Sequence, residues 1–222
     1  MKTFDPNRFG VVSASPNLFL RGNIPLDSDG GFAYESIRSC VQTHLGDDLN
    51  HYELKVVSLI DNVSERALWV PEFTAFNVDP DKYPEAYWPP WMQKGWAYGN
   101  PLNNGTFHYH DVTRFGKIVW WPIEAGGNPP AELLGVPGWN LDGLVDSLNE
   151  WHLNQETRTA VYVHCTLGAD RTGAAIASYL VKYGGLNADQ AIDSVTNGTA
   201  AKVPPSPAYQ ELIRLYAAQF GR

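Results

Sequence analysis

Residues 159–173 read Thr-Ala-Val-Tyr-Val-His-Cys-Thr-Leu-Gly-Ala-Asp-Arg-Thr-Gly, and this stretch decides the fold. Its first five residues, 159–163, are β-branched, small or aromatic, which is typical of a buried strand. Residues 172–183 are rich in helix formers with apolar side chains spaced for one face. The sequence therefore predicts a strand, a short loop and a helix, with Cys165 where the strand meets the helix.

The loop from Cys165 to Arg171 has the composition of a phosphate-binding site. Five residues separate the cysteine from the arginine, which is enough for the backbone to curl so that its N–H groups converge at a helix N-terminus. The arginine can close this ring through two parallel hydrogen bonds to phosphate oxygens. The predicted phosphate-binding residues are Thr166, Leu167, Gly168, Ala169, Asp170 and Arg171.

The same arrangement activates Cys165 as a nucleophile. Converging amides and a nearby guanidinium favour the thiolate over the neutral thiol. Held beneath a bound phosphate, the sulfur can attack phosphorus in line and form a cysteinyl-phosphate, which water then hydrolyses. This route needs no metal and no cofactor. Gly168 is expected to allow a backbone conformation that a side chain would obstruct.

The pattern of His164, Cys165, two residues, Gly168, two residues, Arg171 and Thr172 resembles the signature of cysteine-based protein tyrosine phosphatases, especially the dual-specificity branch. The resemblance implies that the Thr172 hydroxyl stabilises the thiolate released in the second step, or else caps the helix. It implies that His164 supports the loop by hydrogen bonds, although a buried structural histidine is an equal interpretation.

The general acid is the point at which this sequence departs from the family. In Lys117–Pro130, which resembles the strand and mobile loop that carry the acid, Ala125 stands where related enzymes have aspartate. Asp170 is the first candidate, because bacterial tyrosine phosphatases and phosphoinositide phosphatases carry aspartate directly before the arginine. Glu124 is the second, on a glycine-flanked loop able to close over substrate. Alternatively, Asp170 merely caps backbone N–H groups of the loop.

The rest of the chain predicts strands that alternate with helices. Asn17–Pro25 resembles the first strand of these phosphatases, and Lys55–Asp61 reads as the next buried strand. Amphipathic helices are expected over 141–151, over 187–198 with a capping box, and over 206–220. The fold class is therefore α/β, with a central, largely parallel sheet flanked by helices and the loop at a strand's carboxyl end.

A segment of about 68–106 interrupts this pattern and is rich in tryptophan and proline. It lacks a clean period, so we interpret it as an irregular insertion packed by its own aromatic side chains. Alternatively, exposed tryptophans stack on a substrate ring. No repeat or linker divides the chain, so residues 1–222 are expected to form a single phosphatase domain.

Composition limits the partners and the compartment. The two cysteines, Cys40 and Cys165, make no disulfide framework, and neither a secretion signal nor a membrane-spanning run is evident, so we expect a reducing cytoplasm and no stable membrane insertion. A net charge of −8 disfavours nucleic acid. His108, His110 and Asp111 are the best metal candidates, but further ligands are not apparent. Oligomeric state is left open.

Together these features predict a phosphomonoester hydrolase of the protein tyrosine or dual-specificity type, acting on a phosphorylated protein or a small phosphomonoester. A phosphoinositide or phosphosugar phosphatase of the same mechanism is the nearest alternative. A phosphate-binding pseudophosphatase is the alternative from another class, because Ala125 replaces the family's acid.

Overall fold

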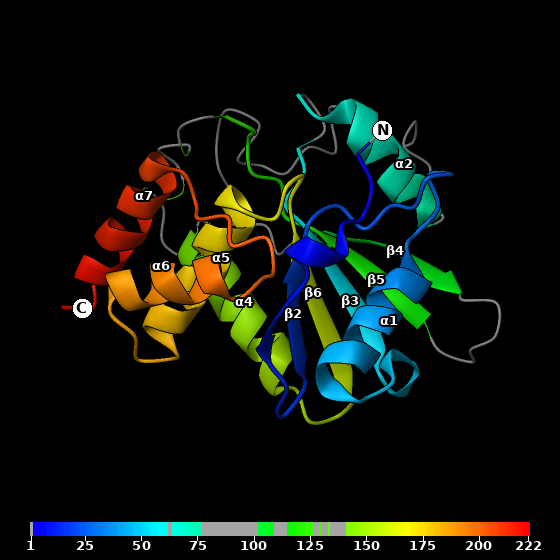
Figure 1. The fold of residues 1–222 in the computed structure, drawn as a ribbon, viewed down its shortest axis with the longest axis horizontal. Coiled ribbons are helices and arrows are strands. Elements are labelled where there is room, and N and C mark those ends of the chain that lie inside the picture. The colour runs from blue at the N-terminus through cyan, green and yellow to red at the C-terminus, as the bar shows by residue number, and fades with distance from the viewer. Residues whose placement is uncertain are drawn as a thin grey trace.

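The computed structural model describes residues 2–61, 64–76, 102–108, 115–126, 129, 133 and 141–222. Six described strands form one sheet in the order β1-β2-β6-β3-β5-β4 (Figure 1). They are β1 (Gly10–Ser13), β2 (Leu18–Gly22), β3 (Glu53–Ser58), β4 (Leu102–His108), β5 (Phe115–Trp120) and β6 (Thr159–His164). The inner pairs β2·β6, β6·β3 and β3·β5 are parallel, and only the edge strands run antiparallel. The predicted α/β fold with a largely parallel sheet is confirmed.

Helices cover both faces of this sheet. They are α1 (Tyr34–Leu45), α2 (Arg66–Ala75), α4 (Leu141–Leu153), α5 (Asp170–Lys182), α6 (Ala188–Asn197) and α7 (Pro207–Ala218), with short 3-10 turns η1 (Pro6–Arg8) and η2 (Leu49–His51). In Figure 1, α4 to α7 group on one side of the strands, whereas α1 lies on the other. No helix within the described ranges is both long and apolar enough to cross a bilayer.

The alternation of side chains along β6 explains this layering. Val161 and Val163 pack into the cluster formed with α4 to α7, while Ala160 and Tyr162 face the opposite cluster with α1 and α2. Successive residues of a strand point to opposite faces, so a strand buried on both sides has to be apolar throughout. The uninterrupted apolar run before Cys165 is therefore the mark of the sheet's centre.

The prediction of an irregular insertion over 68–106 is wrong at both of its described ends. Residues up to Ala75 belong to helix α2, and β4 adds an edge strand to the sheet. Trp69 is fully buried, with its ring 4.6 Å from Phe73 and 5.5 Å from Trp120 between centroids. Pro71 lies inside the helix, and such a residue normally argues against one. Trp88, Trp91 and Trp96 lie outside the described residues.

The capping box predicted at Asn187 is present at the start of α6. The Asn187 side chain accepts a hydrogen bond from Gln190 N at 2.9 Å, and Asn187 N donates to Gln190 Oε1 at 3.1 Å. Two free N–H groups of the first turn are thereby satisfied. The last predicted helix is likewise found as α7, with Pro207 in its first turn.

Candidate active site

Cys165 lies immediately after β6 and before α5, at the carboxyl edge of the sheet. The cysteine is 3% exposed, and Gly168 N donates to its Sγ over 3.3 Å. Since Asp170 is the first residue of α5, the loop delivers its amides at a helix N-terminus, as predicted. The strand, loop and helix expected from the sequence are thus all present around the sulfur.

Gly168 is required by its surroundings as well as by its backbone conformation. Its φ is +72°, in the left-handed region, and a Cβ built there would lie 2.4 Å from the carbonyl oxygen of Gly22. Glycine was expected because a side chain would obstruct the approach to phosphate. The obstruction described by the structure is instead the backbone of β2, against which the loop packs.

Arg171 is held in place by a carboxylate that sequence reasoning missed. Its Nη1 and Nη2 donate to the two carboxylate oxygens of Glu65 at 2.6 and 2.7 Å, and Nη1 also reaches the carbonyl oxygens of Leu59 and Ile123 at 2.9 and 3.0 Å. The side chains of Arg171 and Glu65 are only 8% and 11% exposed. This bidentate pair fixes the plane of the guanidinium beside the loop.

Glu65 also reaches the other end of the loop, because Thr166 Oγ1 donates to its Oε1. The pKa of Glu65 lies below its usual value: burial acts to raise it, but hydrogen bonds and charge from Arg171, with the Thr166 hydroxyl, outweigh burial. The position of Glu65 in the sequence could have indicated its contact with the loop. Glu65 follows β3, which runs parallel beside β6, and the carboxyl ends of parallel neighbours meet at one edge.

The environment of Cys165 favours its thiolate. Burial by itself would raise the pKa of the thiol, but the positive charge of Arg171 and hydrogen bonds from the Thr172 side chain and from the Thr172 and Leu167 amides bring it below its usual value. The positive charge of Arg171 is the largest of the causes that oppose burial. An activated cysteine has this combination of a cation and a helix N-terminus.

His164 is tied to a second buried carboxylate. Its Nε2 lies 2.6 Å from Glu72 Oε1, with both side chains fully buried, and Ser58 Oγ donates to the other Glu72 oxygen at 2.8 Å. The Nδ1 of His164 lies 3.4 Å from the carbonyl oxygen of Cys165. This close contact joins His164, the residue before the loop, to α2, and the support of the loop by His164 hydrogen bonds stays a prediction.

The two acid candidates occupy different surroundings. Asp170 is half-buried, and its Oδ1 accepts a 2.6 Å hydrogen bond from Ser206 N at the start of α7. This bond is of the capping kind, although it caps α7 rather than the loop. Glu124 is exposed, and no described contact joins its side chain to the loop. Asp170 therefore lies nearer Cys165 in the chain, and the choice between the two acids stays a prediction.

The segment that carries Glu124 and Ala125 is nevertheless attached to the site. Ile123 O accepts from Arg171, as described above, and Ala125 N donates to Asp61 Oδ2 at 3.1 Å. Asp61 lies just beyond β3 and also accepts from Ser64 N at 2.7 Å. The residues after β3 and after β5 therefore border the same loop.

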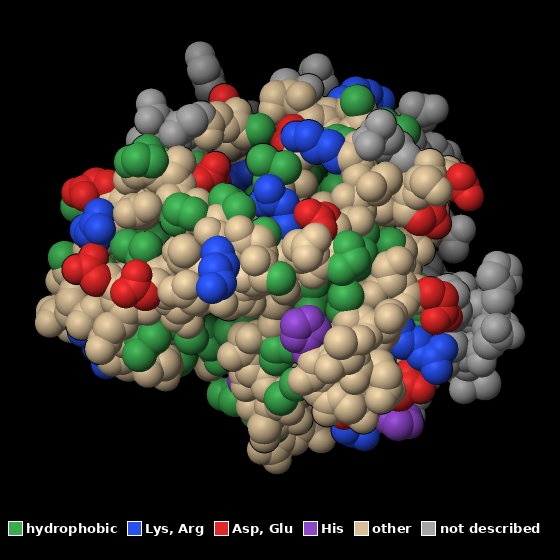
Figure 2. All heavy atoms as spheres, in the orientation of Figure 1, with side chains coloured by type: hydrophobic (Ala, Val, Ile, Leu, Met, Phe, Trp, Pro, Cys, Tyr) green, Lys and Arg blue, Asp and Glu red, His purple; other side chains and the backbone are tan. Residues whose placement is uncertain are grey.

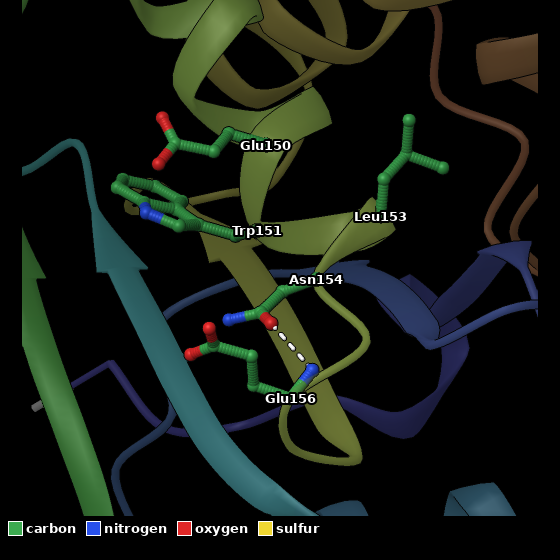
Figure 3. Close-up of a pocket in the computed structure, with 5 residues that line it drawn as sticks. All are labelled: Glu150, Trp151, Leu153, Asn154 and Glu156. Atoms are coloured by element: carbon green, nitrogen blue, oxygen red, sulfur yellow. Dashed lines mark hydrogen bonds between the residues drawn. The ribbon is translucent and has the colours of Figure 1, made fainter.

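Other parts of the surface are distinct from this site. A surface pocket of about 390 Å³ is lined by Glu150, Trp151, Leu153, Asn154 and Glu156. These residues precede β6 (Figure 3), so the pocket lies at the end of that strand opposite Cys165. Acidic and basic side chains are interspersed on the face drawn in Figure 2. No cluster of three potential metal-ligating side chains occurs in the part of the chain that the structure describes. The side chains of His108, His110 and Asp111 lie outside that part.

Comparison with curated sequences gives a match to part of the chain. No protein-family model matches the chain. A phosphatidylinositol 3,4,5-trisphosphate 3-phosphatase, ptn1 of Schizosaccharomyces pombe, is 29% identical over 105 residues. The matched stretch is 47% of this chain and 28% of the yeast protein, so it spans less than a third of that relative.

Comparison with solved structures covers nearly the whole chain. Kinase associated phosphatase matches with a TM-score of 0.54 at 12% identity, covering 96% of this chain and 94% of that one. PTPMT1, solved with PI(5)P, matches with 0.52 at 14% identity over 96% and 97% of the chains. Human DUSP28 matches with 0.51 at 12% identity over 99% of each. The chain has the fold of the cysteine-based tyrosine and dual-specificity phosphatases, as the signature predicted.

Proposed function

We propose that this protein is a phosphomonoester hydrolase of the tyrosine or dual-specificity type that acts through a phosphocysteine intermediate. The observation that carries the proposal is the environment of Cys165: a buried sulfur at the N-terminus of α5, bonded by Gly168 N, with a pKa lowered by Arg171 against the effect of burial. A lowered pKa increases the fraction of thiolate, which is the nucleophilic form, and the same groups attract a phosphate dianion.

In the first step the Cys165 thiolate attacks phosphorus, the sulfur–phosphorus bond forms and the phosphorus–oxygen bond to the leaving group breaks. The departing oxygen takes a proton from an acid, for which Asp170 is the first candidate and Glu124 the second. Inward amides of residues 166–171 and the guanidinium of Arg171 stabilise the charge on the transferred oxygens.

In the second step water attacks phosphorus and the thiolate of Cys165 leaves. The deprotonated acid takes a proton from that water, which restores the enzyme and releases inorganic phosphate. The Thr172 hydroxyl is buried beside the sulfur and stabilises the departing thiolate. Cys40 and Cys165 are both free thiols, and a reducing compartment such as the cytoplasm would keep the nucleophile active.

Substrate choice is the finer part of the proposal. A phosphorylated protein is our first candidate, because Thr166, Leu167 and Ala169 supply no lysine for additional phosphates. A phosphoinositide or phosphosugar is the second, favoured by the activity named for the yeast relative. Binding of phosphate without turnover is the alternative that the alanine at position 125 motivates.

The test is hydrolysis of p-nitrophenyl phosphate by the wild type, Cys165→Ser and Cys40→Ser. Cys40 is the matched control, because it is also a buried free cysteine but lies on α1. We expect Cys165→Ser to abolish turnover and Cys40→Ser to retain it. Turnover that survives in Cys165→Ser would overturn the proposal, whereas tight phosphate binding without turnover in the wild type would identify a pseudophosphatase.

A panel of phosphotyrosine peptide, phosphoserine peptide, phosphoinositide and phosphosugar then separates the substrate classes. A kcat/KM highest for the phosphotyrosine peptide supports the protein phosphatase assignment. A preference for the inositol lipid would replace it with the second candidate.

A further inference from the structure

Two arginines outside the signature bind consecutive carbonyl groups of the phosphate loop. Arg8, in the turn η1, donates from Nη1 to Leu167 O at 2.8 Å. Arg21, on β2, donates from Nη2 to Gly168 O at 2.6 Å. Both residues come from the N-terminal part of the chain, about 150 residues away in sequence. Residues outside the strand–loop–helix unit therefore hold two carbonyl groups of the loop by hydrogen bonds.

Because of the geometry of the peptide bond, these contacts to carbonyl groups also fix the direction of the neighbouring N–H groups. In a trans peptide the C=O and the following N–H point in opposite directions. The carbonyl of Leu167 shares its peptide unit with Gly168 N, which donates to Cys165 Sγ. A guanidinium that holds this carbonyl therefore keeps the Gly168 N–H directed at sulfur. By the same reasoning, Arg21 on Gly168 O orients the N–H of Ala169.

Arg21 also brings positive charge into the interior. The residue is 3% exposed, and its second donor contact, from Nη1 to Val195 O at 2.6 Å, is with the last turn of α6. No carboxylate among the described residues forms an ion pair with it. A buried guanidinium without a carboxylate is costly, and an arrangement that retains one therefore points to a use for its charge.

Arg21 contacts the loop at Gly168 O, and the N–H of the same residue donates to Cys165 Sγ, so the thiolate is the anion that this charge can favour. Burial lowers the pKa of Arg21 to about 10, while the negative charge of Cys165 acts in the opposite direction. Electrostatic coupling is mutual, so the charge of Arg21 favours the thiolate of Cys165 in turn. Arg8 contributes less charge, because Asp5 Oδ2 lies 3.7 Å from its Nε.

We propose that Arg8 and Arg21 are positioning residues that hold two consecutive peptide units of the loop with their N–H groups toward the sulfur and the bound phosphate, and that Arg21 adds a counter-charge behind the thiolate. The inference rests on the proposed function, because it takes Cys165 as the thiolate nucleophile. Arg8 has its main effect through orientation, and Arg21 acts through both orientation and charge.

The experiment measures the rate of alkylation of Cys165 by iodoacetamide as a function of pH, in a Cys40→Ser background. It also measures how strongly inorganic phosphate inhibits that alkylation. Arg8→Gln is the main variant, because Arg8 lies in a surface turn and its loss leaves the core intact. Arg8→Lys and Arg21→Lys are the conservative variants. Arg38→Gln is the control, since it removes one positive charge that pairs with Asp48 on the α1 side of the sheet.

For Arg8→Gln we expect the pH of half-maximal alkylation to rise by roughly 0.5 to 1 and phosphate inhibition to weaken about 3- to 10-fold. Arg8→Lys should keep the alkylation midpoint and the phosphate inhibition close to their wild-type values. Arg21→Lys should leave the alkylation midpoint nearly unchanged, because it keeps the positive charge. It should weaken phosphate inhibition clearly, because it loses the planar guanidinium fork. Arg38→Gln should match the wild type in both measurements.

The outcomes separate this inference from the proposed function. A wild-type midpoint at or above the free-cysteine value of about 8.5, without protection by phosphate, contradicts the function itself. A low wild-type midpoint that Arg8→Gln and Arg21→Lys leave unchanged, together with unchanged phosphate inhibition, overturns only the inference. A lower melting temperature without either change would identify the arginines as purely structural.

Discussion

The side chains around Cys165 divide into groups that act on the sulfur and groups that hold those in place. Arg171 and the loop amides act directly, through charge and hydrogen bonds. Glu65 acts through Arg171, because both of its oxygens accept from the guanidinium. Removal of a member of the first group should change chemistry at once, whereas removal of a member of the second should change geometry and pH dependence.

The general acid is tested by Asp170→Asn and Glu124→Gln, each assayed with an aryl phosphate of poor and of good leaving group. We expect Asp170→Asn to lower kcat by about 10² or more for the poor leaving group and far less for the good one, because only the poor one needs a proton. Asparagine retains the oxygen that accepts from Ser206 N. Equal losses on both substrates would contradict the assignment, and selective loss in Glu124→Gln would transfer it.

The Glu65–Arg171 pair predicts a pH-dependent stability. The folded-state pKa of Glu65 is depressed, so its contribution is fully present above its unfolded pKa of about 4.3 and is lost as pH falls through the folded value. Glu65→Gln should therefore cost about 2–4 kcal/mol of unfolding free energy at pH 7. Urea unfolding of both proteins should show the gap narrowing below pH 4; a gap constant from pH 7 to pH 3 would refute it.

Sequence reasoning singled out Cys165, Arg171, Thr172 and His164 but missed Glu65 and Glu72, the carboxylates that contact two of them. Cys165, Arg171 and Thr172 lie within one motif, so their spacing is visible in the chain. Glu65 and Glu72 reach the loop only through the pairing of β3 with β6 and through the packing of α2. Contacts between residues about 100 positions apart leave no local pattern, and a buried glutamate looks like a surface one when only its neighbours in sequence are read.

At the scale of elements, the loop depends on its packing against β2. Gly168→Ala would place Cβ 2.4 Å from Gly22 O at a positive φ, whereas Gly46→Ala at the end of α1 has a similar φ and nothing within 4 Å. The control, Gly46→Ala, should lower the free energy of unfolding by about 1 kcal/mol. Gly168→Ala should cost at least about 3 kcal/mol and abolish turnover, as chemical unfolding and an activity assay would show. Equal costs for the two substitutions would contradict this packing.

Several elements with a clear period were predicted, but α1 was missed although its buried residues, Tyr34, Ile37, Cys40 and Val41, follow helical spacing. The strand before Cys165, the helix after it, and helices α4, α6 and α7 follow apolar spacing and capping residues. Helix α2 was missed, because Pro71 and several aromatics obscure its period, and β1 was missed because it is a short edge strand of four residues. In these places tertiary packing decides the structure over local propensity.

At the scale of the whole molecule, two hydrophobic clusters on opposite faces of the sheet support the site. Trp69 of α2 belongs to one of them, together with Ile60 and Tyr162 from strands or strand ends that lead toward the site. Trp69→Ala should cost about 3–5 kcal/mol of unfolding free energy, with the 48% exposed Leu153→Ala as a control that costs far less. Urea denaturation checks this, and a loss as small as the control's would place α2 outside the core.

The fold also explains why so few charged groups suffice for the chemistry. The net charge is −8, yet Arg21 and Arg171 are both buried beside one sulfur. Charges act more strongly in a buried setting than on the surface. We therefore expect phosphate to be attracted by internal guanidinium charge and by the N-terminus of α5.

The most direct measurement is acid quenching of a reaction with an aryl phosphate during turnover, followed by mass spectrometry of the peptide that contains Cys165. We expect a phosphate group on Cys165 in the wild type, a greater amount of it in Asp170→Asn if Asp170 also activates the water, and none in Cys165→Ser. Sustained turnover by the wild type with no phosphate on that cysteine, or with phosphate on another residue, would show that Cys165 is not the nucleophile.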